Sequence, residues 1–159
     1  MKKESNPPPP ENAERPAPPP GPEQKPRGYS QHGRDVLLYD GVARMTRTCH
    51  GAALAAGWWT DLETGESLLE TRNHGELFML MVSEIAEAME GDRKNMMDDH
   101  LPHRRSVEVE LADLLIRVHD FAGAYNLDLA AAVIEKLDYN AQREDHKPEN
   151  RRLDNGKKY

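Results

Sequence analysis

Apolar side chains recur at steps of three and four residues in four segments of the chain, which is the spacing of one face of an α-helix. These segments cover residues 34–57, 73–91, 106–125 and 129–146. None of them shows the alternation of apolar and polar residues that is typical of a half-buried strand. The pattern therefore predicts an all-α fold.

The predicted helix boundaries rest on residues that cap or break helices. They are, in chain order, Gly57 at the end of the first helix, Asn73 before and Gly91 after the second, Ser106 before the third, Asp128 before the fourth and Pro148 after it. Between the first two helices, the step from Thr64 to Gly65 predicts a turn within a loop.

Prolines divide the chain into a tail and a domain. Ten of the twelve prolines lie between Pro7 and Pro26, in a stretch with almost no large apolar side chain. Such a segment cannot bury enough surface to offset the entropy of ordering it, so residues 1–30 are expected to form a disordered proline-rich tail. Residues 31–150 then form a single helical domain, and residues 151–159 form a basic C-terminal tail.

Charge and cysteine content narrow the classes of function. The formal net charge of −7 disfavours a general nucleic-acid-binding role, because domains of that class are usually basic. Cys49 is the only cysteine, which excludes an internal disulfide and favours a reducing compartment, and its apolar neighbours indicate a packing role. No apolar run approaches the about 18 residues that span a bilayer. We therefore expect a cytoplasmic protein without membrane contact.

Two pairs of carboxylates interrupt the two most apolar segments. Glu84 and Glu87 stand three residues apart, as do Glu110 and Asp113, so each pair shares one helix face. Four acids in apolar surroundings repel one another and are costly to bury unless they hold a hard divalent cation. The pattern predicts a site for Mg²⁺, with Mn²⁺ as a substitute.

Two alternatives to this metal site stand beside it. In the first alternative, the four acids are surface groups of amphipathic helices and bind no metal. The second is a di-iron site, which is disfavoured because it requires Glu-x-x-His on two helices, whereas Glu87 and Asp113 occupy the corresponding positions here.

The spacing of the two pairs resembles that of a known family. Glu84-x-x-Glu87, followed after twenty-two residues by Glu110-x-x-Asp113, is similar to the ExxE…ExxD signature of MazG-type all-α nucleoside triphosphate pyrophosphohydrolases. The resemblance implies a MazG-like four-helix bundle in which these four acids are the metal-binding and catalytic residues. It also implies hydrolysis of a nucleoside or deoxynucleoside triphosphate at the α–β phosphoanhydride, giving a nucleoside monophosphate and pyrophosphate.

Assembly follows from the amount of apolar sequence. Three apolar helices carry more apolar surface than one small domain can bury, so we expect the core to be completed in a homodimer or homotetramer. The chain has one catalytic segment where longer relatives of the family have two, which leads to the same expectation.

Cations and aromatic residues provide candidate contacts to the rest of a nucleotide. Four polar residues of the fourth predicted helix follow one another at steps of four, three and four residues, so they share one face: Lys136, Asn140, Arg143 and Lys147. Three cations and an amide on one face are suited to bind phosphate oxygens. The alternative is a solvated helix face. The resemblance favours the phosphate role, because the segment EKLDYNAQR is similar to the Lys and Asn positions used near the phosphates in the family.

His50, Trp58 and Trp59 are the candidate base-binding residues. A histidine followed eight or nine residues later by tryptophan is similar to the nucleobase contacts of some family members. Aromatic faces stack on any base, so these residues do not select one. For each tryptophan the alternative is simple core packing, and Tyr125 and Tyr139 are expected in the core or at an interface.

Two further functions remain open. In the first, the chain is a helical interaction module recruited through its proline-rich tail. In the second, it is an inactive family member that binds nucleotides without hydrolysing them. The sequence assigns neither the preferred base and sugar nor the general base, for which Glu87 is one candidate.

Overall fold

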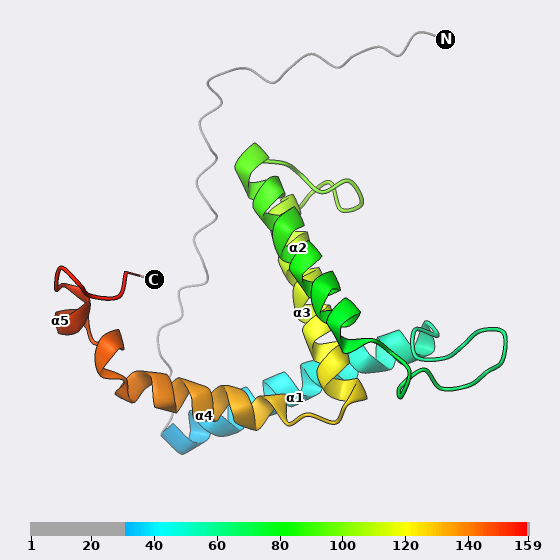
Figure 1. Ribbon diagram of the computed structural model, residues 1–159, viewed down its shortest axis with the longest axis horizontal. Coiled ribbons are helices and arrows are strands. Elements are labelled where there is room, and N and C mark those ends of the chain that lie inside the picture. Colours follow the sequence, from blue (N-terminus) through cyan, green and yellow to red (C-terminus); the bar gives the residue numbers. More distant parts are fainter. Residues whose placement is uncertain (1–30, 159) are drawn as a thin grey trace, which may run out of the picture.

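The computed structural model describes residues 31–158, and in this range every regular element is a helix (Figure 1). The elements are α1 (Gln31–Ala55), α2 (His74–Lys94), α3 (Ser106–Ala124), α4 (Leu129–Gln142), the 3₁₀ turn η1 (Glu144–His146) and α5 (Pro148–Arg151). Two isolated β-bridges in the loops are the only extended pairings of the described range. The all-α prediction is confirmed, and the predicted tail at residues 1–30 lies outside the described residues.

The caps of α2 and α4 lie where the sequence predicts them. The side chain of Asn73 accepts a hydrogen bond from the backbone N–H of Gly75 at 2.9 Å, and that of Asp128 accepts one from Ala131 at 3.0 Å. Asn126 has a φ of 51°, which turns the chain sharply between α3 and α4. These short polar side chains satisfy donors that the first helical turn leaves unpaired.

The end of α2 differs from the prediction. Gly91 does not stop the helix, which continues to Lys94 and ends at Asn95 in the left-handed conformation, with a φ of 52°. Gly91 is instead a packing position: a Cβ built there would lie 2.5 Å from the hydroxyl oxygen of Ser106. Glycine is required by the close approach of α2 and α3, and Asn95 takes the role expected of Gly91.

The boundaries of the two following helices also differ. Ser106 is the first residue of α3, and Arg105 occupies the flanking position without a side-chain capping bond. α4 ends at Gln142, because Arg143 adopts an extended conformation with a ψ of 127°. Pro148 begins α5 where it was expected to end α4, since the first helical position makes no use of a backbone N–H.

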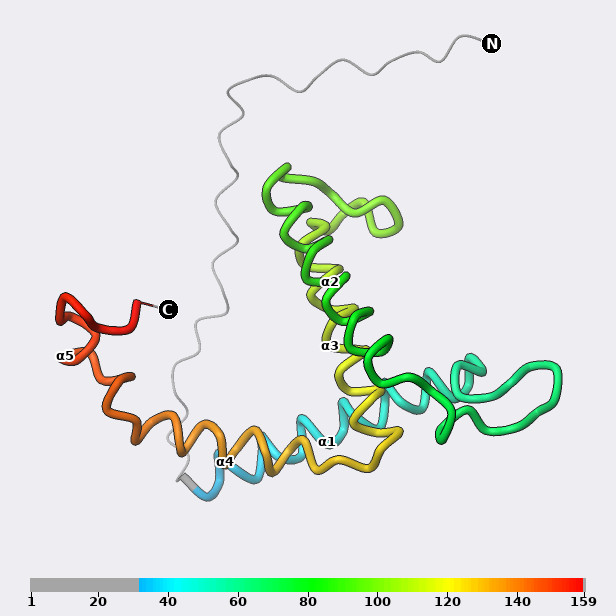
Figure 2. The backbone as a smooth tube through the Cα atoms, viewed as in Figure 1, coloured from blue at the N-terminus to red at the C-terminus, as the bar shows by residue number. Residues whose placement is uncertain are grey.

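The helices pack as successive pairs. α2 and α3 lie side by side and antiparallel, α3 also packs on α1, and α4 runs back along the N-terminal half of α1 (Figures 1 and 2). The α2–α3 pair stands at a steep angle to α1, and α2 and α4 make no comparable contact. Four helices therefore do not close into a bundle within one chain, and the MazG-like four-helix bundle stays a prediction for an assembly.

Much of the apolar surface remains exposed in the single chain. Among the described residues, no large side chain is completely buried, and the buried hydrophobic residues are Cys49, Trp59, Ala88, Ala122 and Ala130. On α2, Met79 is 63% exposed and Met89 is 65% exposed. No helix of the described range is long and apolar enough to cross a membrane. These exposed apolar side chains are the surface that the expected assembly would cover, and the assembly stays a prediction.

Candidate metal and nucleotide site

Three of the four predicted carboxylates converge between α2 and α3. Glu84 of α2 and Glu110 and Asp113 of α3 each place one oxygen so that the three oxygens lie within 4.8 Å of one another. Glu84 is buried, and the other two are half-buried. The antiparallel packing of the two helices brings residues from distant parts of the sequence to one place, as the paired spacing predicts.

Glu87 lies next to this cluster and outside it. It follows Glu84 by one helical turn, its side chain is exposed, and its oxygens are not among the three that converge. Its charge still reaches the cluster, because burial first, and then the charges of Glu87, Glu84 and other neighbouring acids, raise the pKa of Glu110 above its usual value. Glu87 is thus an exposed carboxylate at the edge of the site.

Arg117 forms an ion pair with one acid of the cluster, Glu84. Its Nε donates a hydrogen bond to Oε1 of Glu84 at 2.7 Å, and the side chains of Arg117 and Glu84 are 42% and 8% exposed. The sequence analysis missed this residue. Its signal was the position four residues after Asp113, which places it on the same face of α3.

The donor set fits a hard divalent cation. All three converging groups are carboxylates, which is the ligand type that Mg²⁺ and Mn²⁺ prefer over softer metals. Opposite ligands of a bound Mg²⁺ lie about 4.2 Å apart, so oxygens already within 4.8 Å need only small side-chain rotations to share an ion. Burial first, and then the charges of the neighbouring acids, raise the pKa of Glu110, and a cation bound beside it would favour the ionised carboxylate against both effects.

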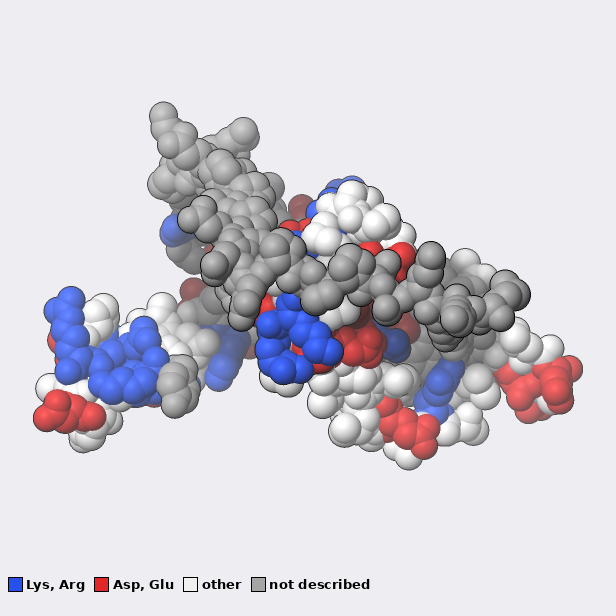
Figure 3. Space-filling view, turned by 90° about the horizontal axis from the view of Figure 1, so that it is seen from above, with Lys and Arg blue, Asp and Glu red and all other residues white. Residues whose placement is uncertain are grey.

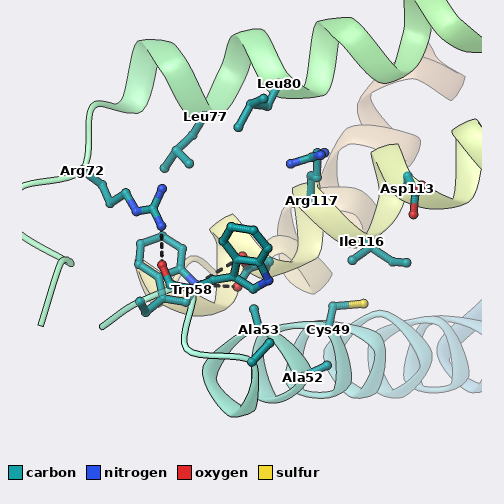
Figure 4. Close-up of a pocket in the computed structure, with 13 residues that line it drawn as sticks. Cys49, Ala52, Ala53, Trp58, Arg72, Leu77, Leu80, Asp113, Ile116 and Arg117 are labelled. Carbon is teal, nitrogen blue, oxygen red and sulfur yellow. Dashed lines mark hydrogen bonds between the residues drawn. The ribbon is translucent and has the colours of Figure 1, made fainter. Parts of the chain in front are cut away.

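A cavity of about 460 Å³ adjoins the cluster, between α1, the loop that follows it, α2 and α3 (Figure 4). Its apolar wall includes alanines of α1 together with Leu77, Leu80 and Ile116. Its polar groups are those of Arg72, Asp113, Arg117 and Asp120. Because Asp113 belongs to both the cavity and the carboxylate cluster, a molecule in the cavity reaches the candidate metal site directly.

The three predicted base-binding residues have different environments. Trp58 lines the cavity and is 65% exposed, whereas Trp59 lines the cavity and is only 6% exposed. His50 does not line it and packs against α3, where Gly123 permits its close approach: a Cβ at Gly123 would meet the His50 Cβ at 2.5 Å. The structure therefore brings the two tryptophans, and not His50, to the cavity surface.

Asp120 joins His50 and Trp59 and was not predicted. The Nδ1 of His50 lies 2.8 Å from Oδ1 of Asp120, and the Nε1–H of Trp59 donates to the same oxygen at 2.9 Å. His50 also packs edge-on to the Trp59 ring, at 5.9 Å between ring centroids. Asp120 stands seven residues after Asp113, two helical turns along α3, which is the signal that the sequence contained.

Arg72 was also missed, and it closes the other side of the cavity. Its guanidinium donates to the backbone carbonyl of Trp58 and lies over the Trp59 ring, 5.6 Å from the centroid. Its Nε is buried and has no hydrogen-bond partner among residues 31–158. Arg72 comes from the loop before α2, where no periodic pattern marks a site residue.

The predicted phosphate-binding residues lie on a different part of the chain. Lys136 and Asn140 belong to α4, which packs on α1 and not on the helices of the carboxylate cluster. Because α4 ends at Gln142, Arg143 and Lys147 do not continue a helical stripe, and they pair with Asp145 and Glu144 instead. Their role in phosphate binding stays a prediction.

Positive side chains gather at the end of the molecule that the C-terminal segment forms (Figure 3). Within it, Lys136 lies 4.7 Å from the Tyr139 ring centroid, and the guanidinium of Arg143 lies 5.9 Å from the same centroid. Tyr139 is exposed, whereas Tyr125 is half-buried among the aromatic rings near the cavity and donates to the Leu69 carbonyl at 3.2 Å. One chain thus holds its acidic cluster and its C-terminal cations on separate helices.

Comparison of the chain with protein-family models, with curated proteins and with solved structures finds no match.

Proposed function

We propose that this protein is a Mg²⁺-dependent nucleoside triphosphate pyrophosphohydrolase of the MazG type. The observation that carries the proposal is the convergence of Glu84, Glu110 and Asp113 within 4.8 Å, beside a cavity lined by two tryptophans and two arginines. Aromatic faces suit a nucleobase and guanidinium groups suit phosphate oxygens, so one continuous site offers a contact for each part of a nucleotide. The reaction is attack of water at the α-phosphorus, with release of pyrophosphate.

The three converging carboxylates are the residues that would hold the ion. Bound Mg²⁺, or Mn²⁺ in its place, supplies charge neutralisation of the triphosphate and a lowered pKa of the attacking water. Glu87 is exposed and outside the converging set, so its carboxylate is available to accept the proton of that water. In this assignment Glu84, Glu110 and Asp113 are ligands, and Glu87 is the general base.

The arginines of the cavity position the substrate. Arg117 reaches the cavity from α3 at the carboxylate cluster, where its Nε lies 2.7 Å from Oε1 of Glu84, and Arg72 reaches the cavity from the loop before α2, beside the tryptophans. An Arg fork pairs with phosphate oxygens in a fixed geometry, which holds the triphosphate in line for attack. At the other end of the substrate, the exposed Trp58 contacts the face of the base, and the buried Trp59 forms the wall of the base pocket.

An assembly completes this site in the proposal. A homodimer or homotetramer would cover the exposed apolar side chains of α2 and form the bundle that one chain leaves open. It is also the way in which Lys136, Asn140, Arg143 and Lys147 of one copy would reach the phosphates held by another. The net charge of −7 supports a free nucleotide as substrate in preference to a nucleic acid, and we place the activity in the cytoplasm.

Pyrophosphate release from a panel of canonical and modified triphosphates, with and without Mg²⁺, tests the proposal. Glu84→Gln and Glu110→Gln each remove one ligand charge with little change of shape, and we expect turnover to fall by at least about 100-fold. Glu108→Gln is the matched control, because Glu108 is an exposed glutamate of α3 that pairs with Arg104 at 3.3 Å. Full turnover of both site variants overturns the assignment.

A thermal melt, read together with the pyrophosphate assay, separates this function from the other two. An enzyme or an inactive nucleotide-binding relative is stabilised by Mg²⁺ with a non-hydrolysable triphosphate, because a ligand that binds only the folded state raises its stability. An interaction module without a nucleotide site shows no such shift. Stabilisation without pyrophosphate release from any triphosphate of the panel identifies the inactive relative.

A further inference from the structure

Among the described residues that line the cavity, Asp120 is the one acid that lies outside the carboxylate cluster. It comes from α3, whereas its two partners come from other parts of the chain: His50 from α1 and Trp59 from the loop after α1. Two donors from separate elements hold the carboxylate in one orientation. A side chain fixed in this way is prepared to recognise a ligand without paying the entropy of ordering itself.

The hydrogen bonds of Asp120 are distributed unequally over its two oxygens. Oδ1 lies 2.8 Å from the His50 nitrogen and 2.9 Å from that of Trp59, while Oδ2 receives only the second, 3.2 Å branch of the Trp59 bond. A carboxylate offers about four acceptor positions and no donor. His50 therefore carries its proton on Nδ1, and Asp120, which lines the cavity, retains acceptor capacity on Oδ2.

We infer that Asp120 determines which base the cavity takes: it selects bases with an exocyclic amino group, namely cytosine, adenine and guanine, over uracil and thymine. The inference rests on the proposed function, because it treats the cavity as the nucleobase site. It gives His50 a positioning role through its bond to Asp120 and leaves the exposed Trp58 to contact the face of the base.

The chemistry of the bases supports this selection. Cytosine and adenine present an amino donor, and guanine presents an amino donor beside a ring N–H, so each can donate to Oδ2. Uracil and thymine present one ring N–H between two carbonyl oxygens, and those oxygens face the fixed carboxylate with like partial charge. A site built around a hydrogen bond disfavours a ligand that lacks the bond, because Oδ2 of Asp120 then keeps only the 3.2 Å branch from Trp59 and loses its contact with water.

Binding of two monophosphates tests the inference without any turnover. Deoxycytidine and deoxyuridine monophosphate differ only at the edge of the base, and titration calorimetry without Mg²⁺ measures the affinity of the full chain for each. We expect deoxycytidine monophosphate to bind at least about tenfold more tightly. Equal affinities, or tighter binding of deoxyuridine monophosphate, overturn the inference.

Asp120→Asn supplies the protein side of the test. The amide oxygen can still accept from His50 and Trp59, while its NH₂ replaces Oδ2 with a donor, so the preference for the amino base should disappear or reverse. Asp138→Asn, at an exposed aspartate of α4, is the matched control and should keep the wild-type preference. An unchanged preference in Asp120→Asn overturns the inference.

A ligand-side variant keeps the test decisive where Asp120→Asn fails to fold. The N4,N4-dimethyl derivative of deoxycytidine monophosphate lacks the amino hydrogens, so the wild-type chain should lose the preference for it, and retained tight binding contradicts the role of Asp120. Pyrophosphate release with no preference among bases also overturns the inference and leaves the proposed function in place. A preference for amino bases without triphosphate hydrolysis supports Asp120 and rejects the enzyme assignment.

Discussion

Arg117 and Glu84 form the closest link between α2 and α3 at the candidate metal site, with Nε of Arg117 2.7 Å from Oε1 of Glu84. The Arg117 guanidinium binds the Glu84 carboxylate, which the proposed metal ion would also bind. Within the isolated chain, Arg117 therefore stabilises the carboxylate of Glu84, whose side chain is only 8% exposed. Metal and arginine are alternative partners of the same acid.

Arg117→Gln should destabilise the metal-free protein and increase its response to metal. Removing Arg117 leaves the buried carboxylate of Glu84 without its ion pair, which costs free energy of unfolding. We expect a loss of only about 1–2 kcal/mol, because Arg117 is partly exposed and water screens the pair. Thermal melts with and without millimolar Mg²⁺ measure both effects. Arg104→Gln, which breaks the exposed pair with Glu108, is the control. An equal Mg²⁺ shift in wild type and Arg117→Gln contradicts the competition.

Glu87→Gln should separate metal binding from turnover. Because Glu87 lies outside the three converging oxygens, its amide variant should bind Mn²⁺ with nearly wild-type affinity. Loss of the general base should nevertheless lower the rate of pyrophosphate release by about 100-fold or more. Mn²⁺ titration followed by electron paramagnetic resonance gives the first quantity and a pyrophosphate assay gives the second. Wild-type turnover would remove Glu87 from the mechanism, and lost Mn²⁺ binding would make it a ligand.

Gly91→Ala should loosen the packing of α2 on α3. The added Cβ meets the Ser106 Oγ at 2.5 Å and its Cβ at 2.8 Å, so the helices must separate, and we expect a loss of about 1–3 kcal/mol in the free energy of unfolding. Gly51→Ala is the matched control within α1, where nothing lies within 4 Å of the new Cβ. That variant should gain up to about 1 kcal/mol from helix propensity. Denaturant unfolding of both variants measures the difference, and equal stabilities would contradict the tight crossing.

The helices and the acidic site were predictable because their signals are local. Carboxylates at steps of three within apolar segments give Glu84, Glu110 and Asp113, and capping residues give the starts of α2 and α4. The end of α2 was misplaced at Gly91, because a glycine that permits helix packing and a glycine that ends a helix look alike in sequence.

Long-range pairings escaped prediction for a related reason. Asp120 binds His50 and Trp59, which are 70 and 61 positions away, and periodicity identifies the apolar face of a helix without naming its partner. The same limit applies to the open arrangement of the helix pairs. Four amphipathic helices predict a bundle in general, but the sequence does not say whether one chain or several chains form it.

His119 gives the α1–α3 interface a dependence on pH. It is buried, its Nδ1 lies 2.9 Å from Oγ1 of Thr46, and burial lowers its pKa from the ordinary value of 6.5. The folded protein thus prefers the neutral ring more strongly than the unfolded chain does. Its contribution to stability is complete above the unfolded pKa and is lost as the pH falls below about 6.5 toward the lower folded pKa.

His119→Gln isolates this contribution, because the amide keeps a polar group near Thr46 and does not titrate. The free energy of unfolding, measured in denaturant between about pH 5 and 8, should fall more steeply toward acid in wild type than in the variant. Other titrating groups, including the carboxylates of the metal site, act on both proteins and cancel in the difference between the two curves. Parallel curves across this range would show that His119 is protonated in the folded protein as readily as in the unfolded one, which its burial between α1 and α3 opposes.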